Sequence, residues 1–558
     1  MVGGALLFPR APIPALQAIG AAPVALLGLA GLMAFVTLVT TLVHVKTGWP
    51  ALAIWAALLV GAGGITLNTV VRDDRRTPPL PEGAASGRPT LEQAASAWLE
   101  HCARAGDGPV RAVVVASAGG ASRAALWTAS VMRRLEGIDP DGKVAEGADL
   151  DPARQLFALS GVSGGALGVA AYAASLARDG AGCRGIEGRA PQPATRHDAL
   201  YEALGRDHLA APLAGMLFSD AYWRLAFPAG LVSSALGWRP VERTGWLERS
   251  WEEAMVREDA GTLLGGLVRR TFPDAPAPAG SAPGASAPQA SAPGAPGPTT
   301  PGPATSGPFA ARPAIPVVIT TGTHQESGNP VVTAAPRLPP ASGAVDALAV
   351  LGRDIPLSVA ASNSARFPYI SAPGLLAGPG GAGPVGQIVD GGYTDNLGTL
   401  GARAAVRALE AAYRDRGWHH GLRIAVVQIL SDPDRDPASV PRCDPRPGPV
   451  RLQPRRPGAL DFVASPIGAL TEVRGVRANE GVAEFVEEFC GTGAGPVRRD
   501  LYVFSLGPGA SGAGAELSWS LSGGARGDIR TWNFRSDAAG LNSAELARFR
   551  RDGTVGSP

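Results

Sequence analysis

The chain has 558 residues and a formal net charge of +2, which allows one large domain with additions but excludes the basic face that nucleic-acid binding requires. Its seven histidines show no H-E-x-x-H or comparable spacing, so we expect no metal ion and no cofactor. The four cysteines (Cys102, Cys183, Cys443 and Cys490) form no C-x-x-C pair and no disulfide framework, which favours a reducing compartment or indifference to redox.

Two long uncharged segments near the amino terminus predict membrane spans. Residues 24–43 and residues 51–71 are both apolar, and each supplies the roughly 20 apolar residues that a spanning helix needs. Residues 46–50, which read Lys-Thr-Gly-Trp-Pro, predict a short turn between them. We therefore expect a transmembrane helical hairpin over residues 21–76, preceded by an N-terminal tail over residues 1–20.

Basic residues flank this hairpin unequally. Arg10 precedes the first span and Arg72, Arg75 and Arg76 follow the second, whereas the turn holds only Lys46. By the positive-inside rule, the tail and the rest of the chain then lie in the cytoplasm. A cleaved signal peptide in the first run is one alternative, and buried helices of a globular domain are another.

Strands and helices alternate along the remaining chain. After a Pro/Gly connector, Thr90 and Gln93 resemble a capping box that opens a helix. Short apolar runs predict strands over residues 110–116, 155–159, 316–321, 385–389, 422–430 and 501–506. Helical patterns occupy residues 122–136, 165–178, 201–256, 401–414 and 459–488. This alternation predicts an α/β layered domain with a mostly parallel sheet.

The composition also divides the chain into segments. Residues 77–108 form a connector and a helix, residues 109–520 the large domain, and residues 521–558 a C-terminal segment. Residues 274–313 are rich in Pro, Ala, Gly and Ser and cannot bury a core, so we interpret them as a disordered surface insertion. The apolar residues 209–227 are either an interfacial helix or lid, or a core helix, and we favour the core helix.

One turn carries a candidate nucleophile. Residues 161–165 read Gly-Val-Ser-Gly-Gly, between a short apolar run and an Ala-rich helix. This strand–turn–helix layout lifts one serine onto a strained elbow and leaves N–H groups to bind a developing oxyanion. Ser163 is therefore a candidate nucleophile, and an ordinary glycine-rich turn is the alternative.

Two further turns follow apolar strands. Gly119, Gly120 and Ala121 open a helix, where backbone N–H groups and the helix dipole suit an oxyanion. A structural turn or a phosphate loop is the alternative, although G-x-G-x-x-G and the lysine of a P-loop are lacking. Asp390 begins an Asp-Gly-Gly turn, where its carboxylate is a candidate base for Ser163 or merely caps the turn.

Together the three turns resemble those of the patatin-like phospholipase family, which has a D-G-G-G-x-R-G loop, a G-x-S-x-G elbow and a D-G-G/A turn. The matching segments here are residues 119–124, 161–165 and 390–392. Residues 360–368 resemble the small-residue helix and Phe-Pro segment that precede the family's aspartate, and Asn396 resembles the asparagine that often follows it.

The resemblance covers residues 110 to at least 430. It departs from the family pattern at Ala118, Ala121 and Ala124, and alanine does not easily take a positive φ.

The resemblance implies a three-layer α/β/α domain that hydrolyses carboxylic esters of membrane lipids, like a phospholipase A or lysophospholipase. Ser163 and Asp390 would form the catalytic dyad, and Gly119, Gly120 and Ala121 the oxyanion hole. The two predicted spans make the chain a multi-pass membrane protein, and we expect a bacterial inner membrane as its location, with the catalytic domain in the cytoplasm.

Two other functions stay open. One is an α/β-hydrolase-type esterase with a Ser–Asp–His triad, because His419 and His420 follow Asp390 in the chain order that such enzymes use. The other is a catalytically inactive membrane scaffold.

Overall fold

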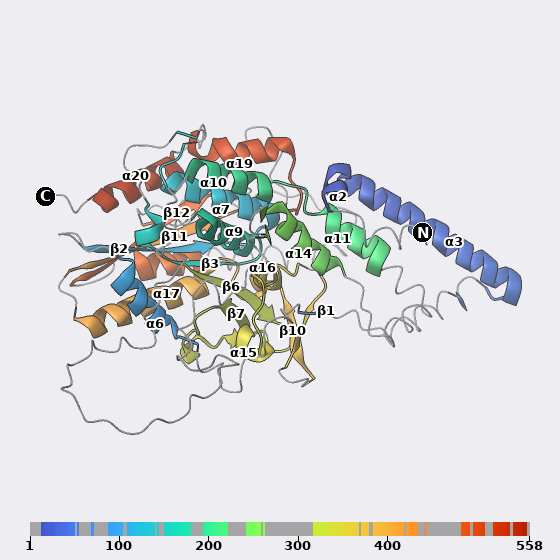
Figure 1. Ribbon diagram of the computed structural model, residues 1–558, viewed down its shortest axis with the longest axis horizontal. Coiled ribbons are helices and arrows are strands. Elements are labelled where there is room, and N and C mark those ends of the chain that lie inside the picture. Colours follow the sequence, from blue (N-terminus) through green and yellow to red (C-terminus); the bar gives the residue numbers. More distant parts are fainter. Residues whose placement is uncertain are drawn as a thin grey trace, which may run out of the picture.

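The computed structural model describes residues 13–50, 53–54, 69–71, 88–103, 109–139, 142–143, 150–179, 193–220, 242–257, 261–262, 316–367, 370–378, 383–417, 420–432, 440, 442–443, 481–490, 495–507, 517–535 and 540–554 (Figure 1). Several predicted features lie outside these residues. They are most of the tail and of the second uncharged run, most of the connector, the Pro/Ala-rich tract, most of the helix expected over residues 459–488, Cys183 and His419.

A ten-stranded sheet forms the centre of the described chain, in the order β1-β9-β10-β6-β3-β2-β11-β12, with β7 beside β6 and β8 beside β7. The neighbouring strands β6, β3, β2, β11 and β12 are all parallel, whereas β7 and β10 run antiparallel to β6. The bounds are β1 (Thr69–Val70), β2 (Val110–Ser117), β3 (Leu156–Gly161), β6 (Val317–His324), β7 (Pro330–Ala334), β8 (Val345–Asp346), β9 (Gly374–Ala377), β10 (Pro384–Val389), β11 (Leu422–Leu430) and β12 (Val497–Ser505). The predicted mixed α/β fold with a mostly parallel sheet is confirmed.

Helices cover both faces of this sheet (Figure 1). On one face lie α7 (Ala121–Leu135), α9 (Gly164–Asp179), α10 (Pro193–Leu204) and α19 (Gly523–Arg535), and on the other lie α6 (Leu91–His101) and α17 (Thr399–Arg416). The capping box at the start of α6 is confirmed, because Thr90 Oγ1 accepts the N–H of Gln93 and Gln93 Oε1 accepts the N–H of Thr90.

The remaining elements surround this frame. They are α2 (Ile13–Ile19), α3 (Ala21–Thr47), α8 (Pro152–Gln155), α11 (Ala210–Ala214), η2 (Gly215–Asp220), α14 (Arg243–Ala254), the strands β4 (Val256–Arg257) and β5 (Gly261–Thr262), η4 (Pro340–Ser342), α15 (Ala347–Leu351), α16 (Leu357–Ser364), η6 (Gly391–Tyr393) and α20 (Leu541–Thr554).

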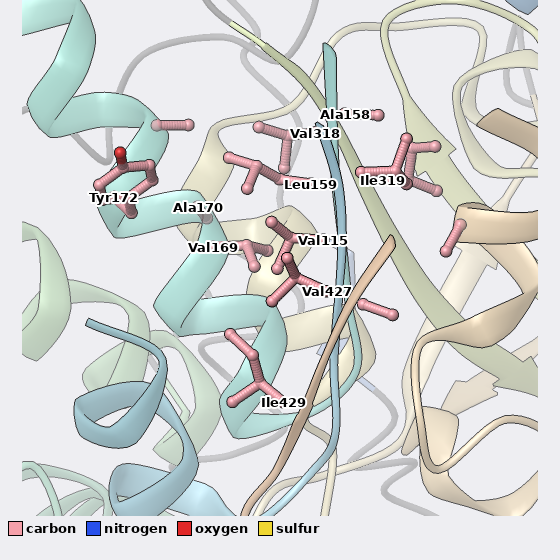
Figure 2. Close-up of a cluster of buried hydrophobic side chains, with 14 of the residues drawn as sticks. Val115, Ala158, Leu159, Val169, Ala170, Tyr172, Val318, Ile319, Val427 and Ile429 are labelled. Carbon is pink, nitrogen blue, oxygen red and sulfur yellow. The ribbon is translucent and has the colours of Figure 1, made fainter. Parts of the chain in front are cut away.

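The core lies between the sheet and the helices. Central parallel strands are buried on both faces, and they therefore read as continuous apolar runs rather than as alternating ones. Figure 2 shows Val169 and Ala170 of α9 facing the side chains of Val115, Leu159 and Val427, which belong to three adjacent strands. This packing holds α9, and with it the turn that precedes α9, against the end of β3.

A single helix in the described chain is long and apolar enough to cross a membrane. It is α3, with 27 residues, a mean hydropathy of 2.3 and 6% of its most apolar window buried. At 1.5 Å per residue its length is about 40 Å. A membrane anchor and a signal sequence both fit this helix, and most of the second predicted span lies outside the described residues.

The start of α3 is bonded directly to the large domain. Asp207 Oδ2 accepts the N–H of Ala21 at 2.8 Å, and Asp207 Oδ1 accepts the N–H groups of Leu209 and Ala210 at 2.9 and 3.0 Å. One carboxylate therefore caps α3 and α11 together. Beside it, Leu217 packs so closely against α3 that a Cβ on Gly28 would lie 2.7 Å from its side chain.

Residues 210–220 therefore pack between α3 and α14 (Figure 1). Their buried side chains form a small apolar cluster with the first helices, comprising Ile13, Leu16, Val24, Ala210, Ala211, Ala214, Leu217, Phe218 and Trp246. The favoured interpretation of this segment as a core helix agrees with this packing, and residues 221–227 lie outside the described chain.

The expectation that the four cysteines form no disulfide framework is wrong. Cys443 and Cys490 form a disulfide across a sequence separation of 47, and Cys102 is also disulfide-bonded. Cys443 is brought to β12, where its sulfur contacts the carbonyl of Leu501, and Cys490 ends a helical segment whose Phe489 is buried in the same core. Tertiary packing creates this proximity, and no local spacing in the sequence reveals it.

Candidate functional site

The carboxyl ends of the central strands bring the predicted turns to one edge of the sheet. The register pairs Ser117, the last residue of β2, with Gly161, the last residue of β3, and with Ile429 near the end of β11. Because these strands are parallel and level, the segments that follow them emerge side by side. The candidate nucleophile and the Gly119–Gly120–Ala121 loop are two of those segments.

Ser163 stands on a strained elbow between β3 and α9. Its φ is +53°, and within the described chain the only other non-glycine residue with a positive φ is Ala121, at +50°. A positive φ is unfavourable for residues with a Cβ and tends to mark functional turns. Ser163 is 7% exposed, and its N–H donates to Ser364 Oγ at 2.9 Å. This is the backbone shape expected of a nucleophile elbow.

The glycines after Ser163 allow two turns to touch. A Cβ on Gly164 would lie 1.9 Å from the carbonyl oxygen of Ala121, and one on Gly165 would lie 2.5 Å from that of Ala118. A side chain at either position would therefore collide with the loop after β2. Across the same contact, a Cβ on Gly119 would lie 3.3 Å from Ser163 Cβ. The elbow and the loop are thus in direct contact.

The loop itself differs in one respect from the expectation. The N–H of Gly119 donates to the carbonyl of Asn396 at 3.0 Å, so it is already engaged, and Ser431 Oγ donates to the carbonyl of Gly119. Gly120, with a φ of +149°, and Ala121 have no hydrogen-bond acceptor for their N–H groups among the residues that the structure describes. Two of the three predicted donors therefore remain available, at the positive end of α7.

Asp390 lies beside the elbow at the end of β10. Its side chain is 1% exposed, its Oδ1 accepts the N–H of Gly392 at 2.8 Å, and its own N–H donates to the carbonyl of Arg366. A Cβ on Gly391 would lie 1.9 Å from the carbonyl oxygen of Thr321 and 3.0 Å from Val162 Cγ1. The turn that holds this carboxylate is therefore packed against the residue that precedes Ser163.

A second carboxylate nearby has a structural role. Asp395 accepts the N–H groups of Leu397, Thr399 and Leu400 at 2.9–3.1 Å, and so it caps the start of α17. Because Asp395 is used to cap α17, Asp390 is the better candidate of the two for the base beside the elbow.

Sequence reasoning gave no role to two serines that support the site. Ser364, the last residue of α16, is fully buried, and its Oγ donates to the carbonyl of Thr321 at 2.5 Å while it accepts the N–H of Ser163. Ser431 follows β11 directly and holds the carbonyl of Gly119. The available signal for Ser431 is a polar residue directly after a buried strand, whereas Ser364 is one of several small residues in the run 360–368 and has no signal of its own.

The histidine required by the triad alternative lies elsewhere. His420 is exposed and sits just before β11, where its carbonyl accepts the hydroxyl hydrogen of Tyr413. The next residue, Gly421, accepts the N–H of Val110 at the start of β2. His420 is thus at the opposite edge of the sheet from Ser163. His419 lies outside the described residues.

A buried carboxyl group with a strongly lowered pKa lies away from this edge, at the far end of α7. Burial alone would raise the pKa of Glu136, but His197, Arg196 and Tyr172 outweigh burial and hold the pKa at about 2. Tyr172 and His197 contact Glu136 at 2.6 and 2.8 Å. This buried ion cluster joins α9 and α10 to the end of α7, and it is a structural feature. Among the described residues no group of three or more His, Cys, Asp or Glu side chains is arranged to hold a metal ion.

Comparison with known proteins gives little further information. No family model matches the chain, and no curated protein matches it. Among solved structures, the chain is similar to the crystal structure of VipD from Legionella pneumophila, with 9% sequence identity, a TM-score of 0.26, and coverage of 81% of this chain and 70% of that one. This similarity is too weak to indicate a function, and the contacts around Ser163 are the features of the chain that point to one.

Proposed function

We propose that this chain is a serine acyl hydrolase of the patatin-like type, with Ser163 as nucleophile and Asp390 as base. The observation that carries the proposal is the positive φ of Ser163 on an elbow that touches both the Gly119–Ala121 loop and the Asp390 turn. A free serine hydroxyl is a weak nucleophile and needs an adjacent base, and the acyl transition state needs hydrogen-bond donors for its oxyanion. These three requirements match the three turns.

The reaction proceeds in two halves. Asp390 accepts the proton of Ser163 as Oγ attacks the ester carbonyl, and the N–H groups of Gly120 and Ala121 stabilise the oxyanion. Gly119 contributes shape rather than a donor, because its N–H is bonded to Asn396. The tetrahedral intermediate collapses to an acyl-enzyme, and the alcohol leaves with the proton from Asp390. Water, activated by the same carboxylate, then hydrolyses the acyl-enzyme.

The proposed substrate is a carboxylic ester of a membrane lipid, such as a phospholipid or lysophospholipid. Support comes from α3, whose apolar length would hold the domain at a bilayer and raise the local concentration of lipid esters. We also propose that the chain crosses the membrane twice. The start of α3 is bonded to Asp207 and the next described strand, β1, pairs with β9, so both ends of the intervening segment are attached to the large domain.

Labelling and turnover test the proposal together. The full chain in detergent is treated with a fluorophosphonate and assayed on a soluble ester and on mixed membrane lipids, beside Ser163→Ala, Asp390→Asn and the control Asp415→Asn, an exposed acid at the end of α17. We expect Ser163→Ala to lose labelling and Asp390→Asn to lose turnover by about 10²–10⁴-fold, the usual contribution of a general base. Full turnover in either variant, or equal labelling of Ser163→Ala, refutes the dyad.

A further inference from the structure

Large apolar side chains are exposed in only two places on the described chain. Twelve such side chains are exposed, and nine of them lie within residues 19–49, on and beside α3. The other three are Val385, Tyr393 and Leu517, which are 51%, 47% and 54% exposed. Single exposed apolar residues are common on soluble surfaces, so their position relative to the site decides whether they matter.

Tyr393 and Leu517 flank the elbow on opposite sides. Tyr393 lies in η6, three residues after Asp390, on the side of the candidate base. Leu517 precedes Ser518, whose carbonyl accepts the N–H of Ser122 at 3.1 Å, in the first turn of α7 and next to the candidate oxyanion donors. Each exposed side chain is therefore within a few residues of one half of the site.

Val385 lies at the same edge of the sheet. It belongs to β10, which runs antiparallel to β6, so the start of β10 extends past the carboxyl end of β6. His324, the last residue of β6, contacts the carbonyl of Val385 at 3.3 Å. Within the described part of the large domain, all three large apolar side chains that are exposed thus occur at the edge where the site is, and we name them the rim.

The start of the apolar helix is linked to the same edge. Asp207 caps α3, and the N–H of the next residue, His208, donates to the carbonyl of Trp519 at 2.9 Å, two residues from Leu517. Trp519 is buried, with its ring centroid 5.1 Å from that of Trp251 on α14. Hydrogen bonds of neighbouring residues thus connect the first turn of α3 to the segment that carries Leu517, and connect that segment to the first turn of α7.

We propose that the rim, formed by Val385, Tyr393 and Leu517, rests on the lipid bilayer, so that the site opens directly onto the lipid surface. The occupant is a membrane because α3 is long and apolar enough to cross one and is bonded, without a linker, to the segment that carries Leu517. An aromatic residue and two aliphatic residues are suited to the boundary between headgroups and acyl chains. This contact rests on the proposed function and adds that the lipid substrate reaches the site directly from the bilayer.

Depth-dependent quenching tests this contact without any enzymatic readout. The full chain with Ser163→Ala is reconstituted in phosphatidylcholine/phosphatidylglycerol vesicles, with a fluorophore on Tyr393→Cys, on Leu517→Cys or on the control Asp415→Cys. Asp415 is exposed at the end of α17, next to the opposite edge of the sheet. The described residues contain no free cysteine, and the chain without an added cysteine gives the labelling background.

Interfacial residues lie roughly 5–10 Å deep, so nitroxide lipids should quench the probes at 393 and 517 at least about threefold more than the probe at 415. Equal quenching at all three positions overturns the proposal. In the active chain, Leu517→Asp should lower the ratio of vesicle hydrolysis to fluorophosphonate labelling about tenfold, the effect of roughly 1.4 kcal/mol of lost apolar contact. An unchanged ratio also contradicts it. If quenching occurs but Ser163→Ala hydrolyses lipid normally, the proposed function fails while the membrane contact stands.

Discussion

Replacing Gly164 by alanine tests whether the elbow at Ser163 and the proposed oxyanion loop, Gly119–Ala121, act together in catalysis. The added methyl would lie 1.9 Å from the carbonyl oxygen of Ala121 and 2.6 Å from its nitrogen, whereas ordinary contact begins at 3.4 Å. The loop must therefore retreat by about 1.5 Å from the elbow, carrying the N–H groups of Gly120 and Ala121 with it. Misplacement by about 1 Å can cost 10²-fold in rate, and one lost oxyanion donor costs about 2.7–4 kcal/mol.

We therefore expect Gly164→Ala to lower kcat by about 10²–10³-fold, with a fall in the free energy of unfolding of only about 1–3 kcal/mol from overpacking. Turnover of a soluble ester gives kcat, and thermal unfolding followed by tryptophan fluorescence gives the stability. The matched control is Gly527→Ala on α19, where an added Cβ would have nothing within 4 Å. A folded Gly164→Ala protein with the kcat of the control refutes the reasoning.

Three further predictions follow from the contacts described. Ser364→Ala should lower kcat about tenfold or more, because it leaves the buried N–H of Ser163 without its acceptor, and Ser364→Thr should restore the rate if the hydroxyl is what matters. Burial lowers the pKa of His208 from 6.5 to about 4. As the pH falls below 6.5, the histidine is protonated in the unfolded chain before it is protonated in the folded one, so the free energy of unfolding should fall by about 3 kcal/mol between pH 6.5 and 4. Denaturant unfolding of the wild type and of His208→Gln across this range measures the difference, and parallel pH profiles would contradict it. Removing Cys443 and Cys490 together should lower the free energy of unfolding by about 4 kcal/mol, from the separation of 47 residues. Cells alkylated before lysis should show this pair oxidised, a result that would place the domain outside the reducing cytoplasm and contradict the positive-inside expectation, whereas full alkylation would support that expectation.

The sequence predicted the parts of the site that depend on local chemistry. A glycine-flanked serine between a buried strand and an Ala-rich helix has few other backbone solutions, and the elbow at Ser163 took the expected form. Ala121 shows the limit of that reasoning. Alanine disfavours a positive φ, yet Ala121 adopts one beside the closely packed Gly164, so tertiary packing overrides the local preference.

Local patterns in the sequence could not predict the contacts between distant segments. The N–H of Gly119 is engaged by Asn396, which lies 277 positions later in the chain, and the acceptor for the N–H of Ser163 comes from Ser364. Neither pairing has a signature in spacing or composition, because both depend on how distant segments of the chain pack together in the folded domain. The disulfide between Cys443 and Cys490 has the same origin.

The shared cap at Asp207 has a practical consequence for preparing the protein. Membrane enzymes are often shortened at the amino terminus to make them easier to handle, and α3 is the obvious segment to delete. Here that deletion would remove the N–H that Asp207 Oδ2 accepts and would uncover Leu217 and the apolar side chains around it. A shortened chain should therefore aggregate more readily than the complete one, and mild detergent around the intact helix is the better route to a monodisperse sample.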